Sequence, residues 1–168
     1  SNIAGTTRDA VDTKLENNHG KFTFIDTAGI RRQSKINDNI EKYSVLRSYM
    51  AVDRSDVCVI MIDATEGFTE QDSKVAGYAH EQGKACVIAI NKWDAIEKDN
   101  DTVKTHTEKI RQILSFMPYA EILFISAKSG QRVTKLFELI DIVLENNSMR
   151  VATGVLNEIV TEAVAMQQ

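Results

Sequence analysis

The fold of this chain is indicated most clearly by one segment, Ala85-Cys86-Val87-Ile88-Ala89-Ile90-Asn91-Lys92-Trp93-Asp94. It begins with a run of apolar residues, which is typical of a β-strand buried on both faces, and the pattern NKxD follows directly. An aspartate carboxylate at the end of such a strand can accept two hydrogen bonds, from the N1–H and the N2 amino group of guanine. Adenine offers neither donor there. The stretch therefore predicts a buried strand that ends in a guanine-reading loop.

The loop residues have distinct expected roles. Asn91 ties the loop to its neighbours and contacts the base edge, Lys92 lays its alkyl stem along base and ribose, and Asp94 reads guanine. With Trp93 between them, these residues form the expected nucleotide-binding segment. The alternative is a polar strand-to-helix loop that spells NKWD by chance, and the further motifs below weigh against it.

Composition places the chain among ordinary globular domains, with 168 residues that are 43% hydrophobic and 26% charged. A net charge of -4 gives no basic surface, so we expect no direct nucleic-acid binding by this segment. The two cysteines lie in apolar runs without disulfide or zinc spacing, and are expected to be reduced core residues. No apolar run approaches the ~18 residues of a membrane helix, and no signal peptide opens the chain, so we expect a cytoplasmic protein without membrane contact.

Helix and strand patterns alternate along the chain. Alternating polarity over residues 10–15 and 21–26, around a turn at 17–20, predicts an antiparallel hairpin. Helices are expected over 38–55, 69–82, 102–116 and 134–146, and strands over 57–62, 85–90 and 121–125, with 57–62 also buried on both faces. Strands joined by such helices pair in parallel through right-handed crossovers. The prediction is a doubly wound α/β sheet with helices on both faces and ligand loops at the carboxyl ends of its strands.

The tail forms a separate unit in this interpretation. Apolar residues at helical spacing between Thr153 and Met166 predict an amphipathic helix whose apolar face needs a partner. We therefore expect a main domain over 1–150 and the start of another over 151–168.

Further motifs fall at or beside the strand ends. In Asp26-Thr27-Ala28-Gly29, the carboxylate can hold a water of Mg²⁺ and the glycine N–H can approach a γ-phosphate. In Gly5-Thr6-Thr7-Arg8-Asp9, a threonine hydroxyl can complete the coordination of Mg²⁺. In Ser126-Ala127-Lys128, a backbone N–H can reach the O6 atom of guanine. Each motif is weak alone, but their order together with NKWD predicts a GTP-binding, GTP-hydrolysing domain.

The chain resembles the second GTPase domain of the Der (EngA) family of bacterial GTPases. The matching stretches are SNIAGTTRDAVDT, IDTAGIRRQSK, EKYSVLRSYMAVDRSDV, TEQDSKVAGYAHEQGKA and NKWD. The resemblance implies tandem GTPase domains in the parent protein, a KH-like domain that begins at 151–168, and a role in assembly of the large ribosomal subunit. It also implies the Ras-like P-loop GTPase fold.

The same resemblance assigns roles to individual residues. It implies that Thr7 and Asp26 bind Mg²⁺ and that Gly29 contacts the γ-phosphate, which makes these the expected catalytic residues. Ile30 stands where small Ras-like GTPases carry a water-positioning glutamine. The chain thus resembles the hydrophobic-substituted GTPases, several of which use K⁺, and Thr6 is a possible K⁺ ligand. Simple packing of a loop is the alternative reading of Ile30.

No GxxxxGKS or GxxxxGKT occurs in the sequence, so the phosphate-binding loop of this fold is not found. The family places it upstream of Ser1, after a first strand, and we expect an amino-terminally truncated domain that lacks both. Two other interpretations stay open: a nucleotide-free structural or interaction fragment, and a related GTPase of the tRNA-modification or Era type.

Overall fold

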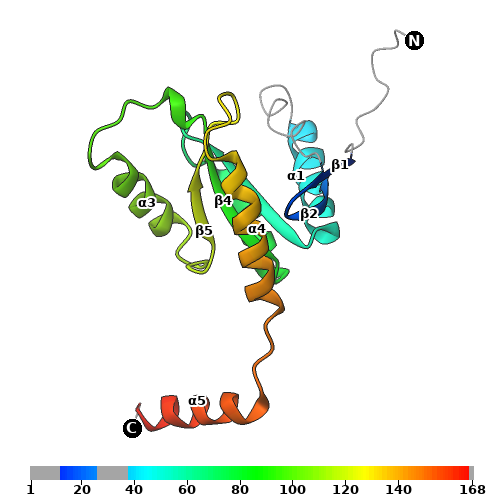
Figure 1. Cartoon of the computed structure of the whole chain (residues 1–168), viewed down its shortest axis with the longest axis vertical. Coiled ribbons are helices and arrows are strands. Elements are labelled where there is room, and N and C mark those ends of the chain that lie inside the picture. The colour runs from blue at the N-terminus through cyan, green and yellow to red at the C-terminus, as the bar shows by residue number, and fades with distance from the viewer. Residues whose placement is uncertain (1–11, 26–37, 167–168) are drawn as a thin grey trace.

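A computed structural model describes residues 12–25 and 38–166 of the chain, with side chains described from residue 45 onward in the second range. A β-hairpin comes first, and helices and strands alternate after it (Figure 1). The elements are β1 (Asp12–Asn17), β2 (Gly20–Ile25), α1 (Asp38–Arg54), β3 (Val57–Asp63), α2 (Glu70–Glu81), β4 (Ala85–Asn91), the 3₁₀ turn η2 (Trp93–Ala95), α3 (Thr102–Ile113), β5 (Glu121–Phe124), α4 (Val133–Ser148) and α5 (Thr153–Ala165).

The central sheet is parallel, in the order β3-β4-β5. The register pairs Val57 with Ala85 at one end and Asp63 with Asn91 at the other. The carboxyl ends of β3 and β4 therefore lie side by side, as expected for parallel strands joined by helical crossovers. Every residue of β4 before Asn91 is buried, which confirms the two-sided burial predicted for this strand.

Helices cover both faces of the sheet. On one face, Ala76 and Ala79 of α2 and Ile110 of α3 belong to the same apolar cluster as Ile88 and Ile90. On the opposite face, α4 buries its own apolar residues against Val87 and Ala89 of β4; they are Leu136, Ile140 and Val143. The doubly wound α/β fold predicted from the sequence is confirmed.

The hairpin β1-β2 forms its own two-stranded sheet, paired from Asp12 with Ile25 to Asn17 with Gly20. Its aromatic side chains pack on α4, where the rings of Phe22 and Phe137 lie 5.2 Å apart in an edge contact. His19 Nδ1 also lies 2.8 Å from the Asp141 carboxylate. Within the described residues β2 has no ladder with β3. The hairpin is joined to the rest of the domain by side-chain contacts with α4 and by the ion pair of Asp12 with Arg54 of α1.

Two details differ from the sequence-based expectations. The prediction that β3 is buried on both faces was wrong in part, because Met61 is 44% exposed and Val59 is half-buried. Two-sided burial needs helices above and below a strand, and α4 lies mainly over β4, which leaves one face of β3 partly uncovered.

Helix α3 ends at Ile113 and not at residue 116, since the chain turns there to bury Leu114 and Met117 completely.

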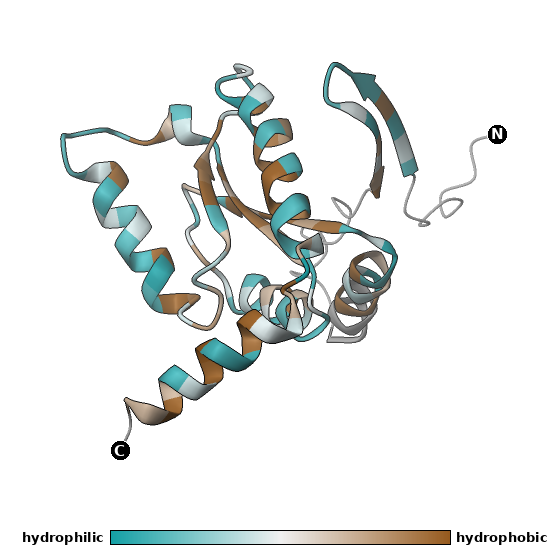
Figure 2. Cartoon of the chain, turned by 60° about the horizontal axis from the view of Figure 1, so that its bottom comes forward, coloured by the Kyte–Doolittle hydropathy of each residue, from teal (hydrophilic) through white to brown (hydrophobic). Residues whose placement is uncertain are grey.

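Helix α5 is amphipathic as predicted, but every residue in it is exposed. It stands apart from the sheet in Figure 1, and Figure 2 shows the apolar residues along its length. Val155, Ile159 and Val160 therefore form an apolar surface without a partner among the described residues. The domain boundary at residue 150 stays a prediction.

Cys58 and Cys86 are buried and free, which confirms their expected place in the core. They lie opposite each other on β3 and β4. Among the helices that the structure describes, none has the length and apolar character to span a bilayer.

Candidate nucleotide-binding site

The loop after β4 turns sharply because Lys92 adopts the left-handed helical conformation, with φ 60° and ψ 31°. The 3₁₀ turn η2 follows at once, and Ala95 N–H donates to the Lys92 carbonyl at 3.0 Å. Trp93 N–H donates to the carbonyl of Ile125 at 3.0 Å, so the loop is hydrogen-bonded to the end of the neighbouring strand β5. On the side of β3, Ala64 N–H donates to the carbonyl of Asn91 at 2.9 Å, so backbone contacts hold the predicted base-reading segment on both sides.

Trp93 points inward from this loop and is only 2% exposed. Its ring centroid lies 4.4 Å from that of Phe124 and 5.2 Å from that of His106, which meets it edge-on. The ammonium group of Lys98 lies 5.9 Å from the centre of the indole. A buried side chain in this position packs against the core beneath the loop. In nucleotide binding, Trp93 would therefore hold Lys92 and Asp94 in place.

Asn91 links the NKWD and SAK motifs. Its side-chain oxygen accepts a hydrogen bond from the backbone N–H of Ala127 at 2.9 Å, and its amide nitrogen lies 3.7 Å from the sulfur of Met61. The sequence predicted that both motifs lie at one edge of the sheet, and the structure brings them into direct contact. The Ala127 N–H, one candidate for the donor to guanine O6, already has this partner within the protein.

Asp94 is exposed at the surface of the loop. A hydrogen bond from the Ser126 hydroxyl lowers the pKa of this carboxyl, and the charges of Lys128 and Lys98 lower the pKa further. Ser126 is fully buried and its oxygen also accepts from Ser129 N–H at 3.1 Å, so its position is fixed. Asp94 is thus an ionised, accessible acceptor, which is the form that two guanine donors require.

Asp63 is the last residue of β3, and its carboxylate lies at the same edge of the sheet as these loops. One carboxylate oxygen lies 2.5 Å from Lys92 Nζ, and the other accepts from the hydroxyl and the N–H of Thr65 at 2.7 and 2.9 Å. Burial alone would raise the pKa of Asp63, but the hydrogen bonds from Lys92 and Thr65 lower it to about 2. In the sequence, Asp63 is recognisable as an acidic residue at the carboxyl end of an apolar strand, where a nucleotide pocket is expected, but no individual role was predicted for it.

The remaining expected site residues lie outside the described part of the chain. They are Thr6 and Thr7 in the threonine loop and Asp26, Thr27, Ala28, Gly29 and Ile30 in the DTAG segment. The Mg²⁺ and K⁺ ligands predicted among them stay predictions. Within residues 12–25 and 38–166, no group of three or more histidine, cysteine, aspartate or glutamate side chains is placed to hold a metal ion.

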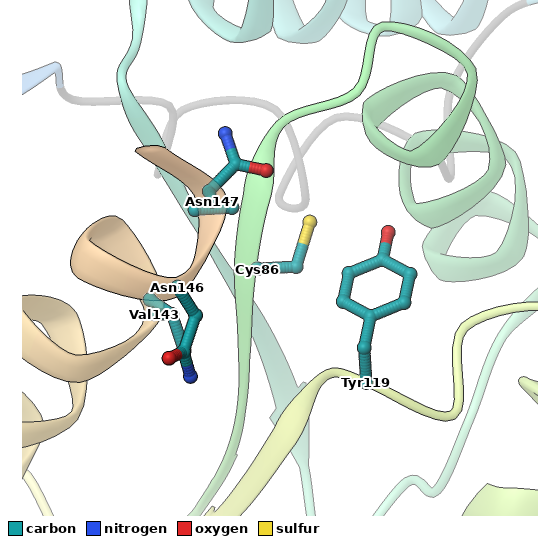
Figure 3. Close-up of a pocket in the computed structure, with 6 residues that line it drawn as sticks. Cys86, Tyr119, Val143, Asn146 and Asn147 are labelled. Carbon is teal, nitrogen blue, oxygen red and sulfur yellow. The ribbon is translucent and has the colours of Figure 1, made fainter. Parts of the chain in front are cut away.

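A cavity of about 210 Å³ lies at the opposite end of the sheet, between the start of β4 and the end of α4. Figure 3 shows Cys86 and Tyr119 on one side of it, and Val143, Asn146 and Asn147 of α4 on the other. Ligand loops of doubly wound sheets lie at the carboxyl ends of the strands. This cavity is at the amino ends, so it is separate from the candidate site.

Comparison with known families identifies the family of this chain. The model of the 50S ribosome-binding GTPase family matches residues 1–92, which include the threonine loop, the DTAG segment and the start of NKWD. The chain belongs to the family of 50S ribosome-binding GTPases. It is 72% identical over its whole length to GTPase Der of Agathobacter rectalis and 60% identical to GTPase Der of Lachnoclostridium phytofermentans.

These relatives confirm the resemblance of this chain to the Der family. The chain spans 38% of the length of each of them.

Solved structures of similar fold include bound forms of the GTPase Era. Era in complex with MgGDPNP and a segment of 16S ribosomal RNA matches 86% of this chain, with a TM-score of 0.63 and 29% identity, and this chain covers 46% of Era. A variant of Aquifex aeolicus Era bound to GDP and AlF₄⁻ matches the same share of both chains, at 30% identity and TM-score 0.63. The Ras-like P-loop GTPase fold predicted from the sequence is therefore confirmed.

Proposed function

We propose that this chain carries the base-reading and switch elements of a GTP-binding, GTP-hydrolysing molecular switch. The observation that carries the proposal is the contact between the loops after β4 and β5. Asn91 accepts a hydrogen bond from Ala127 N–H, and Ser126 donates one to Asp94, so the NKWD and SAK motifs form one continuous surface. An ionised carboxylate at this surface suits guanine, which offers two donors to it, at N1 and N2.

The phosphate end of the nucleotide would be bound by residues outside the described ranges. Thr7 and Asp26 have the oxygen chemistry that Mg²⁺ prefers, and Gly29 leaves room for a phosphate at its backbone N–H. Bound Mg²⁺ would neutralise charge on the phosphates. Thr6 is the proposed K⁺ ligand. The MgGDPNP complex of Era, a structural neighbour, supports Mg²⁺ as the cofactor.

The proposed setting is the cytoplasm, and the proposed partner is the large ribosomal subunit during its assembly. Two findings support this partner: the description of the matching family as 50S ribosome-binding GTPases, and the high identity to proteins named GTPase Der. The full-length protein would associate with the ribosome differently in its GTP-bound and GDP-bound states. Cosedimentation with large subunits in the presence of a GTP analogue or GDP tests this part, and nucleotide-independent or absent association would argue against it.

Base specificity tests the nucleotide part of the proposal directly. The test uses a protein extended to the full length of the Der relatives, with the base-reading aspartate of the other implied GTPase domain changed to asparagine. In this protein, Asp94→Asn should further weaken GTP binding and improve binding of xanthosine triphosphate. The reason is that the xanthine C2 oxygen repels the carboxylate but accepts from an amide. The exchange should shift the ratio of the two affinities by roughly a hundredfold, since each charged hydrogen bond contributes about 1.5–3 kcal/mol.

Asp101→Asn is the matched control, because Asp101 is an exposed aspartate in the same connection whose side chain makes no capping hydrogen bond. It should leave the base preference unchanged. Unaltered preference in the Asp94 variant would refute the assignment of NKWD as the guanine-reading loop.

A further inference from the structure

A buried carboxylate at the end of β3 has no part in the nucleotide contacts assigned so far. Asp63 is 7% exposed, and both of its carboxylate oxygens have partners on the protein: Thr65 on one side and Lys92 on the other. Its backbone carbonyl also accepts from Gly67 N–H at 2.8 Å. Asp63 is therefore fixed in position by the loop that follows it, and offers a rigid negative charge to Lys92.

Lys92 is the residue at which the base-reading loop changes direction. Its left-handed backbone conformation costs a residue with a side chain roughly 1–2 kcal/mol relative to the right-handed helical one. This conformation sends Trp93 into the core while Asn91 and Asp94 stay at the carboxyl edge of the sheet. An attraction that holds the side chain of Lys92 also holds this turn.

The geometry separates the two ends of the Lys92 side chain. Its ammonium group is paired with Asp63, yet the side chain as a whole is 56% exposed. A side chain that is held at its ammonium end and is more than half exposed can lie against a base and ribose along its alkyl stem. The charge of Asp63 holds the ammonium end of this side chain at the edge of the sheet.

We propose that Asp63 is a positioning residue for guanine recognition, which holds the loop from Asn91 to Asp94 in its reading conformation by anchoring Lys92. The proposal rests on the proposed function, since it needs Asp94 to read guanine. If the ion pair of Asp63 mattered only for stability, its loss would leave base selectivity unchanged. A positioning role instead requires that its loss change base selectivity.

The test compares the affinities for GDP and IDP in a protein extended to the full length of the Der relatives. The base-reading aspartate of the other GTPase domain implied by the Der resemblance is changed to asparagine, so that guanine selectivity reports on this site. IDP lacks the N2 amino group, so a correctly placed Asp94 should favour GDP by roughly tenfold or more. Asp63→Asn keeps the shape and an acceptor for Thr65 but removes the charge that attracts Lys92. It should lower the GDP-to-IDP ratio by about threefold or more.

Further variants separate positioning from stability. Lys92→Met keeps an unbranched apolar stem on an exposed residue and removes the same ion pair, so it should lower the ratio as Asp63→Asn does, and the double variant should add little. Asp72→Asn removes an equally buried carboxylate that caps α2, and should lower the melting temperature without changing the ratio.

An unchanged ratio in Lys92→Met, or an equal fall in Asp72→Asn, would overturn the positioning role of Asp63 while leaving the guanine site in place. A ratio near one in the parent protein would instead overturn the guanine site itself, and the role of Asp63 with it. If Asp63→Asn fails to fold, the Lys92 variant decides the question alone.

Discussion

Asn91 ends β4 and Ala127 lies in the loop after β5, and the side-chain oxygen of Asn91 accepts a hydrogen bond from the backbone N–H of Ala127 at 2.9 Å. Asn91→Ala should therefore loosen the loop after β5 from the loop after β4. A net hydrogen bond contributes about 0.5–1.5 kcal/mol, so we expect GDP affinity to fall roughly tenfold or less from this contact alone. Calorimetric titration of GDP into the protein extended to the length of the Der relatives measures the effect.

Asn91→Asp is the matched variant for that experiment. It retains an oxygen that accepts from Ala127 N–H, so it should keep the link between the loops, but it loses the amide nitrogen and adds a negative charge beside Asp63. If Asn91→Ala leaves GDP affinity unchanged and only Asn91→Asp weakens it, the link to Ala127 contributes nothing measurable to binding.

The ion pair of Asp63 predicts a specific loss of stability in acid. The pKa of this carboxyl is lowered from 3.8 to about 2 in the folded protein, so the folded state favours the charged form. That contribution, about 2 kcal/mol, is present above pH 4 and is lost as pH falls from about 4 to 2. Urea unfolding at successive pH values should show this fall, and Asp63→Asn should flatten the curve over the same window.

The interior of β4 should be sensitive to truncation. Ile88 is fully buried in the cluster that joins the sheet to α2 and α3, so Ile88→Ala should lower the free energy of unfolding by about 2–5 kcal/mol. Ile142→Ala, on a residue of α4 that is 47% exposed, should lower it by less than about 1 kcal/mol. Chemical denaturation compares the two. Equal effects would mean that β4 is not the centre of the core.

Hydrolysis should depend on the monovalent cation. Ile30 has no polar atom to orient the attacking water, so charge on the transferred phosphate would be stabilised by an ion held at the threonine loop. We expect faster GTP hydrolysis in K⁺ than in Na⁺ at equal ionic strength in the full-length protein. Thr7→Ala should also slow hydrolysis more than Ile30→Ala. Equal rates in the two salts would discard the K⁺ ion from the mechanism.

The sequence predicted the regular elements well because local signals mark them. Thr69 and Asp72 form the reciprocal hydrogen bonds of a capping box at the start of α2, and this helix begins within a residue of the expected place. The carboxyl end of α3 was placed too late, since Leu114 and Phe116 continue a helical spacing although only Leu114 is buried. Periodicity does not show where tertiary packing ends a helix.

At the candidate site, spacing located the motifs but could not show which side chains touch. The pairing of Lys92 with Asp63 depends on the register between β3 and β4 and on a left-handed residue, and neither has a signature in the sequence. Trp93 illustrates the same limit. Its place within NKWD suggested contact with the nucleotide, whereas the reversal at Lys92 turns its indole into the core.

The burial of Trp93 gives the chain a built-in optical sensor. It is the single tryptophan of the 168 residues, it directly precedes Asp94, and its ring meets the imidazole of His106 edge-on. Indole emission depends on the polarity around the ring and is quenched by a nearby imidazolium. Fluorescence from this chain therefore originates beneath the candidate guanine-reading loop, and it reports on the packing around Trp93 without any attached dye.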